Sequence, residues 1–436
     1  MSTNPRQATL NVCKSLLVLS LTIPAVAQTS QPADTGATSE AKAYDPWTSK
    51  TMTGDWFGLG EEMDKIGLDF SLAFQHQYQQ NFRGGKETHN GSRQTGTYDA
   101  VLKLDLEKIG LIENAGFYFK WKGSYGDGIS SSNVGALGKV NSDTNGDHPV
   151  FVKKWWYWHK FLDDKIELRL GMIETNKDLF DVSLYANHED KDFLNRTSSR
   201  NPTIPHQTGI GAFLKVEPVE WFYMQGAVVD AQARDRRTGF DTAFHDEAHF
   251  LAFYEFGFTP EWETEKGPLP GSYRMGLWYD PTSQKIFKNT LGGRLRDEYR
   301  GDDVGFYIGL DQMVFKENDD PKDKQGLGVF ARYGYAHSDV NTVDSYWQTG
   351  TSYTGLIPTR DKDVFGFSVA QAMISEQRRA EVDAGADRET VYEWYYKFYV
   401  TPWLNISPDL QVITNPGGDK DARDAIVGGI RLQVIF

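Results

Sequence analysis

Charged side chains recur at every second position within several apolar stretches of this 436-residue chain. In FYFKWK, for example, Lys120 and Lys122 alternate with aromatic residues. The charged positions that share this alternation are Lys120, Lys122, Glu167, Arg169, Arg274 and Arg332. Guanidinium and ammonium groups donate hydrogen bonds and carboxylates accept them, so this composition suits a ligand that is rich in hydroxyl groups.

The long connector 175–207 contains a second concentration of side chains that could bind hydroxyl groups. Its polar members are Asn176, Asp178, Asp181, Glu189, Asp190, Asp192, Arg196 and Arg200. Such a segment either remains an ordinary solvated loop or folds inward beside the alternating charges. We expect the inward arrangement, in which Asn176, Asp178 and Arg196 join the wall residues at a constriction.

Three tryptophans, Trp155, Trp156 and Trp158, lie close together in one apolar stretch. Their rings could stack on the apolar faces of pyranose sugars, or they could form an aromatic belt at a membrane interface. Alternation places Trp156 and Trp158 on one face and Trp155 on the other. We expect the interfacial role for most of them.

Two motifs resemble metal sites without matching them. HDEAH, at 245–249, has its glutamate one place late for a zinc-protease helix and lies where a loop passes into a strand. NSDTNGD, at 141–147, resembles half of a calcium loop, but Val152 stands where the closing glutamate belongs. We expect no cofactor and no catalytic metal, and we leave open a structural Ca²⁺ near Asp143.

Apolar side chains with a period of two dominate the rest of the chain, which is the pattern of strands with one apolar face. The stretches that show it are 69–82, 98–106, 117–125, 152–161, 166–172, 208–216, 220–230, 248–258, 272–280, 303–313, 326–337, 345–356, 363–373, 390–401, 407–414 and 425–436. The stretch 345–356 has a weak pattern. It is included because an antiparallel barrel with both ends on one side needs an even number of strands.

The connectors between these strands alternate in length. Long polar connectors occupy 83–95, 126–150, 175–207, 231–247, 281–302, 338–344, 374–389 and 415–424, and the intervening links are short. Short turns at one end and long loops at the other are typical of outer-membrane barrels. The sequence therefore predicts a 16-stranded antiparallel transmembrane β-barrel, with short periplasmic turns, long extracellular loops and a short N-terminal helix.

The N-terminal segment predicts export. Two basic residues precede the apolar run LLVLSLTIPAV, and Ala25-Val26-Ala27 has the form of a cleavage site. We expect a signal peptide at 1–27, a flexible segment at 28–52, a short helix at 53–68 and the barrel at 69–436. The one cysteine, Cys13, lies in the signal, so we expect no disulfide framework.

Charge narrows the possible partners. Removal of 1–27 leaves 44 basic and 60 acidic residues, a net charge of −16. Nucleic acid is therefore not an expected partner. The same strands could in principle form a secreted soluble sugar-binding β-protein, but nearly every predicted strand has one apolar and one polar or small face, which favours the membrane barrel.

The sequence resembles the carbohydrate-selective porins of the OprB type. TGDWFGLGEEMDKIGL near the start, NFRGG after the first strand and ETVYEWYYKFYVTPWLNISPDLQVITNPGG near the end support the resemblance, which spans about 53–436. In TGDWFGLG, Phe57 stands where the family pattern has a second glycine, and Gly60 where it has an arginine. The family implies an outer-membrane channel, monomeric or homotrimeric, through which small sugars diffuse.

The resemblance also implies what the chain contacts and what it does not do. Outer-membrane lipid, lipopolysaccharide and the barrel-assembly machinery are the implied partners, and terminal Phe436 resembles the assembly signal of such barrels. An outer-membrane barrel hydrolase is the enzymatic alternative. No cluster of a nucleophile and a base stands out in the sequence, so we expect no enzyme. We expect 425–436 to pair with 69–82 and close the barrel.

Overall fold

Alternation of apolar and polar residues produces strands along almost the whole described chain, because each strand can present one face to lipid and the other to the interior. The computed structural model describes residues 44–176, 178–186, 192–234, 240, 242–243, 248–287, 298–320, 323–382, 385–419 and 421–436. The predicted signal peptide at 1–27 and positions 28–43 of the predicted flexible segment lie outside these residues.

The elements of the first half of the chain have the following bounds. They are α1 (Gly54–Phe57), α2 (Leu59–Lys65), β1 (Leu68–Gly85), β2 (Ser92–Asp105), β3 (Ala115–Tyr125), η1 (Ser130–Val134), β4 (His148–Phe161), β5 (Ile166–Glu174), α3 (Arg196–Ser199), β6 (Thr208–Val219), β7 (Phe222–Asp230), β8 (Phe250–Phe258) and β9 (Glu261–Thr264).

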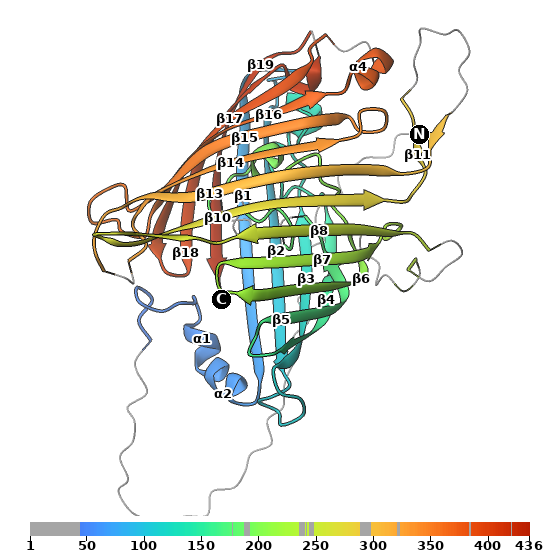
Figure 1. Ribbon diagram of the computed structural model, residues 1–436. Helices are drawn as coiled ribbons and strands as arrows, with labels where there is room; N and C mark the ends of the chain where they lie inside the picture. The colour runs from blue at the N-terminus through green and yellow to red at the C-terminus, as the bar shows by residue number, and fades with distance from the viewer. Residues whose placement is uncertain are drawn as a thin grey trace, which may run out of the picture. The chain divides into compact units, whose positions relative to one another are not determined.

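The second half continues in the same manner around the barrel (Figure 1). Its elements are β10 (Gly267–Asp280), β11 (Gln284–Lys285), β12 (Tyr299–Arg300), β13 (Asp303–Lys316), β14 (Gly326–Ala336), β15 (Val343–Thr354), β16 (Val364–Ile374), α4 (Glu376–Val382), β17 (Arg388–Thr401), β18 (Leu404–Thr414), η4 (Pro416–Gly418) and β19 (Arg423–Ile435).

The sheet closes on itself. Every strand pairs antiparallel with its neighbour, and β1 pairs with both β2 and β19, with Ala73 opposite Ile435 and Asn81 opposite Val427. The segments β8 and β9 both pair with β10 and together form one barrel strand that is interrupted at 259–260. The barrel therefore has sixteen strands, as predicted, and β15 is the strand that the even-number requirement located.

The N-terminal segment contacts the barrel where the first and last strands meet. The amide of Met52 donates to the carbonyl of Ile435, at 2.8 Å, and Trp56 Nε1 donates to the carbonyl of Phe70, at 3.2 Å. Gly58 has φ 86° between α1 and α2, a left-handed conformation that glycine adopts without strain. Within the described part of the chain, every helix is too short or too polar to cross a membrane.

Several of the connectors are shorter than predicted, and two of them show the reason. The predicted connector 83–95 is largely strand, because β1 continues to Gly85 and β2 begins at Ser92. The connector 338–344 is likewise shortened, since β15 begins at Val343. In both cases polar residues occur within the extended strands, and hydrogen bonding between the strands continues beyond the apolar stripe that marked them in the sequence.

The buried apolar side chains join loops to the inner wall. Phe180 and Ile204 of the connector 175–207 pack with Phe213, Phe253 and other side chains of the wall from β5 to β14. In a second cluster, three residues of the connector 126–147 pack against β17, β18 and β19. The expectation that nearly every strand has one polar or small face therefore does not extend to this wall, because its loop-covered part is shielded from water and takes apolar residues.

Candidate functional site

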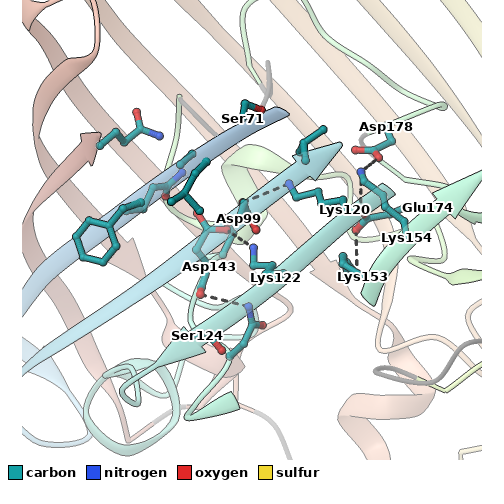
Figure 2. A pocket seen from close by; sticks show the side chains of 18 of the residues that line it. Ser71, Asp99, Lys120, Lys122, Ser124, Asp143, Lys153, Lys154, Glu174 and Asp178 are labelled. Carbon is teal, nitrogen blue, oxygen red and sulfur yellow. Dashed lines mark hydrogen bonds and ion pairs between the residues drawn. The ribbon is translucent and has the colours of Figure 1, made fainter. Parts of the chain in front are cut away.

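A cavity with a volume of about 880 Å³ lies on one side of the barrel interior. Its wall is formed by β1 to β5, by Asn405 of β18 and by the end of β19, and residues of 126–147 and 175–207 form the rest of the lining. Figure 2 shows its charged side chains, which extend from neighbouring strands toward a shared space. The loops thus narrow the interior to a space of the size that small-molecule sites usually have.

Two lysines of β3 face this cavity in ion pairs. Lys120 Nζ lies 3.2 Å from Asp99 of β2, and Lys122 Nζ lies 3.6 Å from Asp143 of the connector 126–147 (Figure 2). Both lysines retain some exposed side-chain surface. Because charged side chains on the lipid face would cost about 2–4 kcal/mol at mid-depth, their inward direction follows from the alternation of the strand.

A bulge in β4 brings two consecutive lysines to the same carboxylate. Lys120 pairs with Lys154 across the sheet, the next residue Trp121 pairs with Val152, and Lys153 is therefore the extra residue. The ammonium groups of Lys153 and Lys154 lie 3.5 and 3.4 Å from the two oxygens of Glu174. Lys154 also contacts Asp178 of the connector 175–207. Because of the bulge, the positive charges of Lys153 and Lys154 lie at the same point of the wall, beside Glu174.

A row of planar groups crosses four adjacent strands beside these lysines. Tyr118 of β3 stacks on Trp156 of β4 with the ring centroids 4.0 Å apart. The Arg169 guanidinium of β5 lies 5.4 Å from the Trp156 ring and 5.2 Å from the Phe213 ring of β6. Glu167 holds Arg169 through a contact of 2.6 Å. Trp156 therefore lines the cavity. It does not have the role in an interfacial aromatic belt that we expected for most tryptophans of this stretch.

The connector 175–207 is seated by a buried ion cluster on the opposite wall. Asp181 has no exposed side-chain surface and lies 3.2 Å from Arg274 of β10 and 3.4 Å from Arg332 of β14. Arg274 also pairs with Asp311 of β13. Arg332 donates to the carbonyl of Ser198, at 2.9 Å. Charges so deeply buried need partners, and here each arginine has them on the loop.

Three buried glutamates of the wall hold the backbone of the loops. Glu255 of β8 accepts from the Asp181 amide, at 2.9 Å, and Glu393 of β17 accepts from the amides of Leu194 and Asn195, at 2.5 and 3.1 Å. Glu389 of β17 accepts at 2.7 Å from the amides of Leu137 and Gly417, which lie in two further connectors. Carboxylates are strong acceptors for backbone amides, so these contacts fix the loops against the wall.

The connector 126–147 contributes to the constriction as well. The amide of Ser142 donates to the carbonyl of Leu194, and the amide of Arg196 donates to the carbonyl of Lys139, each at 2.8 Å. The carbonyl of Val140 accepts from side chains of β1 and β18, at 3.0 and 2.9 Å. The sequence indicated only 175–207 as the inward loop. The two loops are in fact hydrogen bonded to each other inside the barrel.

His206 lies at the junction of loop and wall. It contacts Arg200 Nη1 at 2.9 Å and Glu174 at 3.2 Å. Burial, aided by the neighbouring charge of Arg200, holds the pKa of His206 well below its usual range, although Glu174 acts in the opposite direction. The imidazole is therefore neutral at neutral pH and adds no charge to the cavity.

The structure divides the predicted site residues between the cavity and the loop support. Lys120, Lys122, Arg169, Asp178 and Arg196 line the cavity. Glu167 is not part of the lining but pairs with Arg169, which is. Asn176 is buried within the connector, where it donates to the carbonyls of Asn201 and Ile204, each at 3.3 Å, and Arg274 and Arg332 are buried beneath the loop. Contact between any of these residues and a sugar stays a prediction.

Several cavity residues were not found from the sequence. Asp99, Lys153, Lys154, Glu174 and His206 all line the cavity. Strict alternation assigns only one of two consecutive lysines to the interior, and a bulge leaves no mark in the pattern. Glu174 lies at the end of β5 and His206 lies in a connector, where alternation fades. Asp99 lies in the middle of β2, on the polar face that alternation gives it, but it was not among the predicted site residues. The two consecutive lysines, Lys153 and Lys154, were nevertheless visible in the sequence and could have indicated the bulge.

The described residues contain no group of three or more His, Cys, Asp and Glu side chains that could hold a metal ion. Asp143, the residue near which we left a structural Ca²⁺ open, lies beside Lys122, and an ammonium group is an unfavourable neighbour for a cation. Positions 245–247 of the HDEAH motif lie outside the described residues.

A closed sixteen-stranded barrel that encloses a polar cavity narrowed by inward loops defines the class of outer-membrane porins. The family model of the carbohydrate-selective porins, OprB family, matches residues 89–436, and the chain belongs to this family. It is thus a porin of the bacterial outer membrane rather than an enzyme. Membership of this family excludes the two alternatives, an outer-membrane barrel hydrolase and a secreted soluble sugar-binding protein.

Individual relatives extend over nearly the whole chain. Porin B of Pseudomonas aeruginosa is 25% identical over 92% of this chain and 94% of its own length. A putative porin, QuiX, of Acinetobacter baylyi is 20% identical over 90% of this chain and 95% of its own length. The high-pH structure of Pseudomonas putida OprB matches the fold with a TM-score of 0.80 at 23% identity, over 89% of this chain and 99% of that one.

Proposed function

We propose that small sugars diffuse passively across the outer membrane through the cavity between the β1–β5 wall and the two inward loops. The observation that carries this proposal is a set of charged and aromatic side chains, able to bind hydroxyl groups, around a space of about 880 Å³. Lys120, Lys122 and Arg169 would donate to sugar hydroxyls and Asp178 would accept from them. The edges of Tyr118 and Trp156 would border the apolar parts of the ring.

Binding in such a channel is weak. A solute must enter favourably and leave quickly, so we expect an affinity of millimolar order, which corresponds to about −4 kcal/mol. The charged groups are arranged in pairs, such as Lys120 with Asp99, and a sugar hydroxyl would replace one partner of a pair during passage. Asn176, Arg274 and Arg332 would act indirectly, by holding the loop that defines the width of the cavity.

The remaining parts of the proposal concern assembly. Residues 1–27 would direct export and be removed, and the barrel-assembly machinery would insert the chain beside lipid and lipopolysaccharide. The inserted protein would be a monomer or a homotrimer. Support for the barrel as the assembled unit comes from the pairing of β1 with β19, which leaves no unpaired sheet edge at the seam.

Reconstitution tests the diffusion of sugars. Purified protein in planar bilayers should produce discrete conductance steps that glucose reduces in a concentration-dependent manner, and proteoliposomes should swell in glucose faster than in a disaccharide of twice the mass. Protein that is heat-denatured before reconstitution is the control. A folded protein that neither conducts nor admits glucose would contradict the proposal.

A further inference from the structure

A patch of exposed apolar side chains lies on the segment 44–67, which precedes the first barrel strand. Phe57 at the end of α1, Leu59 at the start of α2 and Ile66 just after α2 are 87%, 63% and 60% exposed. Trp47 is exposed as well. None of the described residues of this segment lines the cavity. Exposed apolar patches mark contacts with other proteins or with membranes, so this one calls for a partner outside the pore.

Hydrogen bonds and an ion pair hold the segment at the short-turn end of the barrel. Trp403, in the short turn between β17 and β18, donates through Nε1 to the carbonyl of Pro46, at 2.7 Å. Lys108, in the short turn between β2 and β3, lies 2.7 Å from Asp64 of α2. In Figure 1, α1 and α2 lie at the end of the barrel where the C-terminus is marked. The short turns of outer-membrane barrels are periplasmic, so the segment borders the periplasmic leaflet.

Trp56 of α1 packs on the outer side of β1. Its ring centroid lies 5.1 Å from that of Phe70. Gln77 and Gln79 of β1 are buried in the barrel interior, and the pairing of β1 with β2 has no bulge from Leu68 to Gln80. Alternation therefore directs Phe70 outward, toward lipid. The apolar patch is continuous with the lipid-facing surface of the barrel.

The preceding part of the chain is a poor cover for the patch. Residues 28–43, QTSQPADTGATSEAKA, contain no apolar side chain larger than that of proline. A stretch of this composition has too little apolar surface to gain by packing on a phenylalanine or an isoleucine. The acyl chains of the membrane are the apolar material that lies beside the patch.

The charge of α2 indicates which lipid suits the segment. Leu59, Met63 and Ile66 recur at i, i+4 and i+7 and therefore share one side of the helix. Other positions of α2 carry three acidic residues and one lysine, namely Glu61, Glu62, Asp64 and Lys65. Interfacial helices are held by burial of their apolar side and by attraction of basic residues to anionic lipid. With an acidic excess, only the apolar term favours this segment, which suits zwitterionic lipid.

We propose that the segment 44–67 anchors this porin in the periplasmic leaflet of the outer membrane, with Phe57, Leu59 and Ile66 inserted among the acyl chains of zwitterionic phospholipid. Trp56, packed on Phe70, holds the segment at the level of the lipid headgroups, where amphipathic aromatic rings are favoured. The inference concerns a surface outside the pore and does not depend on the proposed diffusion of sugars.

Quenching of a fluorescent dye tests the insertion. Cys13→Ser removes the one cysteine of the chain, and a new cysteine at Leu59, or at Glu62 as the control, then carries an NBD dye. Nanodiscs of phosphatidylcholine leave both membrane faces open to water. The dye at Leu59 should be quenched by lipid with a spin label on its acyl chain and little by iodide in the water. The dye at Glu62 should show the reverse.

Matched variants assign the anchoring to the apolar side chains. In Phe57→Asn with Ile66→Ser, asparagine tolerates the left-handed backbone of Phe57 (φ 61°), so the apolar surface is the main loss. Hydrogen exchange of the amides of 55–66 in nanodiscs should accelerate by about tenfold for each apolar side chain removed from lipid. Phe57→Leu with Ile66→Leu should restore the protection. Glu61→Gln with Glu62→Gln should leave exchange unchanged, and heat-modifiable gel mobility confirms that each variant is folded.

Several outcomes would overturn this inference. Quenching of the dye at Leu59 by iodide alone would show that the patch lies in water. Protection that occurs only in nanodiscs with two barrels would assign the patch to a second copy of the chain. Protection that requires anionic lipid would contradict the choice of zwitterionic lipid, and equal effects of the acidic and the apolar variants would contradict the assignment to Phe57 and Ile66. Glucose-dependent conductance of the same variants reports separately on the proposed function.

Discussion

Asp181 and its two arginines show how single residues set the width of this channel. The carboxylate is fully buried and contacts Arg274 and Arg332, which extend from strands β10 and β14. Removal of one member of such a cluster leaves charge without its partner in a region that water does not reach, and this is costly. We therefore expect residues that the solute does not touch to help determine the pore.

Replacement of Arg332 tests this support. Arg332→Gln should destabilise the seated loop by about 3–5 kcal/mol, because Asp181 and the carbonyl of Ser198 lose a charged donor. We expect a higher and noisier single-channel conductance and weaker block by glucose. Arg332→Lys keeps the charge but lacks the planar guanidinium group. Its conductance and its block by glucose should lie between those of Arg332→Gln and those of the wild type. An unchanged conductance for Arg332→Gln in a correctly folded barrel would contradict this role.

The inner wall of the strands is shaped to receive the loop. Gly328 and Gly334 of β14 lie where a Cβ would overlap Tyr185 and Thr203 of the connector 175–207. Their missing side chains let the loop lie close to the wall on this side, so the cavity remains on the side of β1 to β5. At the level of elements, glycines on one wall and lysines on the other divide the interior into a packed half and a polar half.

Filling the wall at Gly328 should displace the loop. In Gly328→Ala the added methyl group meets the Tyr185 ring, and overpacking of this kind costs about 1–3 kcal/mol. We expect a lower unfolding temperature on heat-modifiable gels together with a changed conductance. Gly301→Ala is the matched control, because an added Cβ there has nothing within 4 Å. If the two variants behave alike, the close packing of loop and wall is not what positions the cavity.

The whole molecule is organised by two solvents, lipid outside and water inside. Leu214 of β6 lies on the outer face between Leu168 of β5 and Gly226 of β7 and is 46% exposed. The next residue, Lys215, has the opposite direction and pairs with Glu217 at 2.8 Å. Neighbouring residues of one strand thus face different surroundings, as expected for a closed barrel in a membrane.

A charge on the outer face should be penalised. Leu214→Arg should destabilise the barrel in lipid vesicles, with a decrease of about 2–4 kcal/mol in the free energy of unfolding if the site lies near the bilayer midplane. Urea titration of the vesicle-inserted barrel, followed by gel mobility, measures this. Leu214→Met preserves the apolar character and should shift the midpoint little. Equal midpoints for Leu214→Arg and the wild type would show that this face is not in contact with lipid.

Much of the fold could be predicted because the membrane imposes a simple rule on each strand. The face of Lys120 and Lys122 followed from alternation, and β15 followed from the requirement for an even number of strands. The site was less accessible to sequence reasoning. Arg274 and Arg332 were placed on the inner face, but no pattern showed that a loop would cover them. The bulge at Lys153 and the role of Glu255, Glu389 and Glu393 left no periodic signal.

The sequence by itself determined the strand pattern, the closure of β19 on β1 and the identity of the inward face, since each depends on local alternation against a uniform solvent. Tertiary structure alone decided which inward residues face the cavity and which face a loop. That choice depends on contacts such as Glu393 with Leu194, between residues that are far apart in the chain. Local periodicity contains no information about such pairs, because a loop folds to satisfy whichever wall groups it reaches.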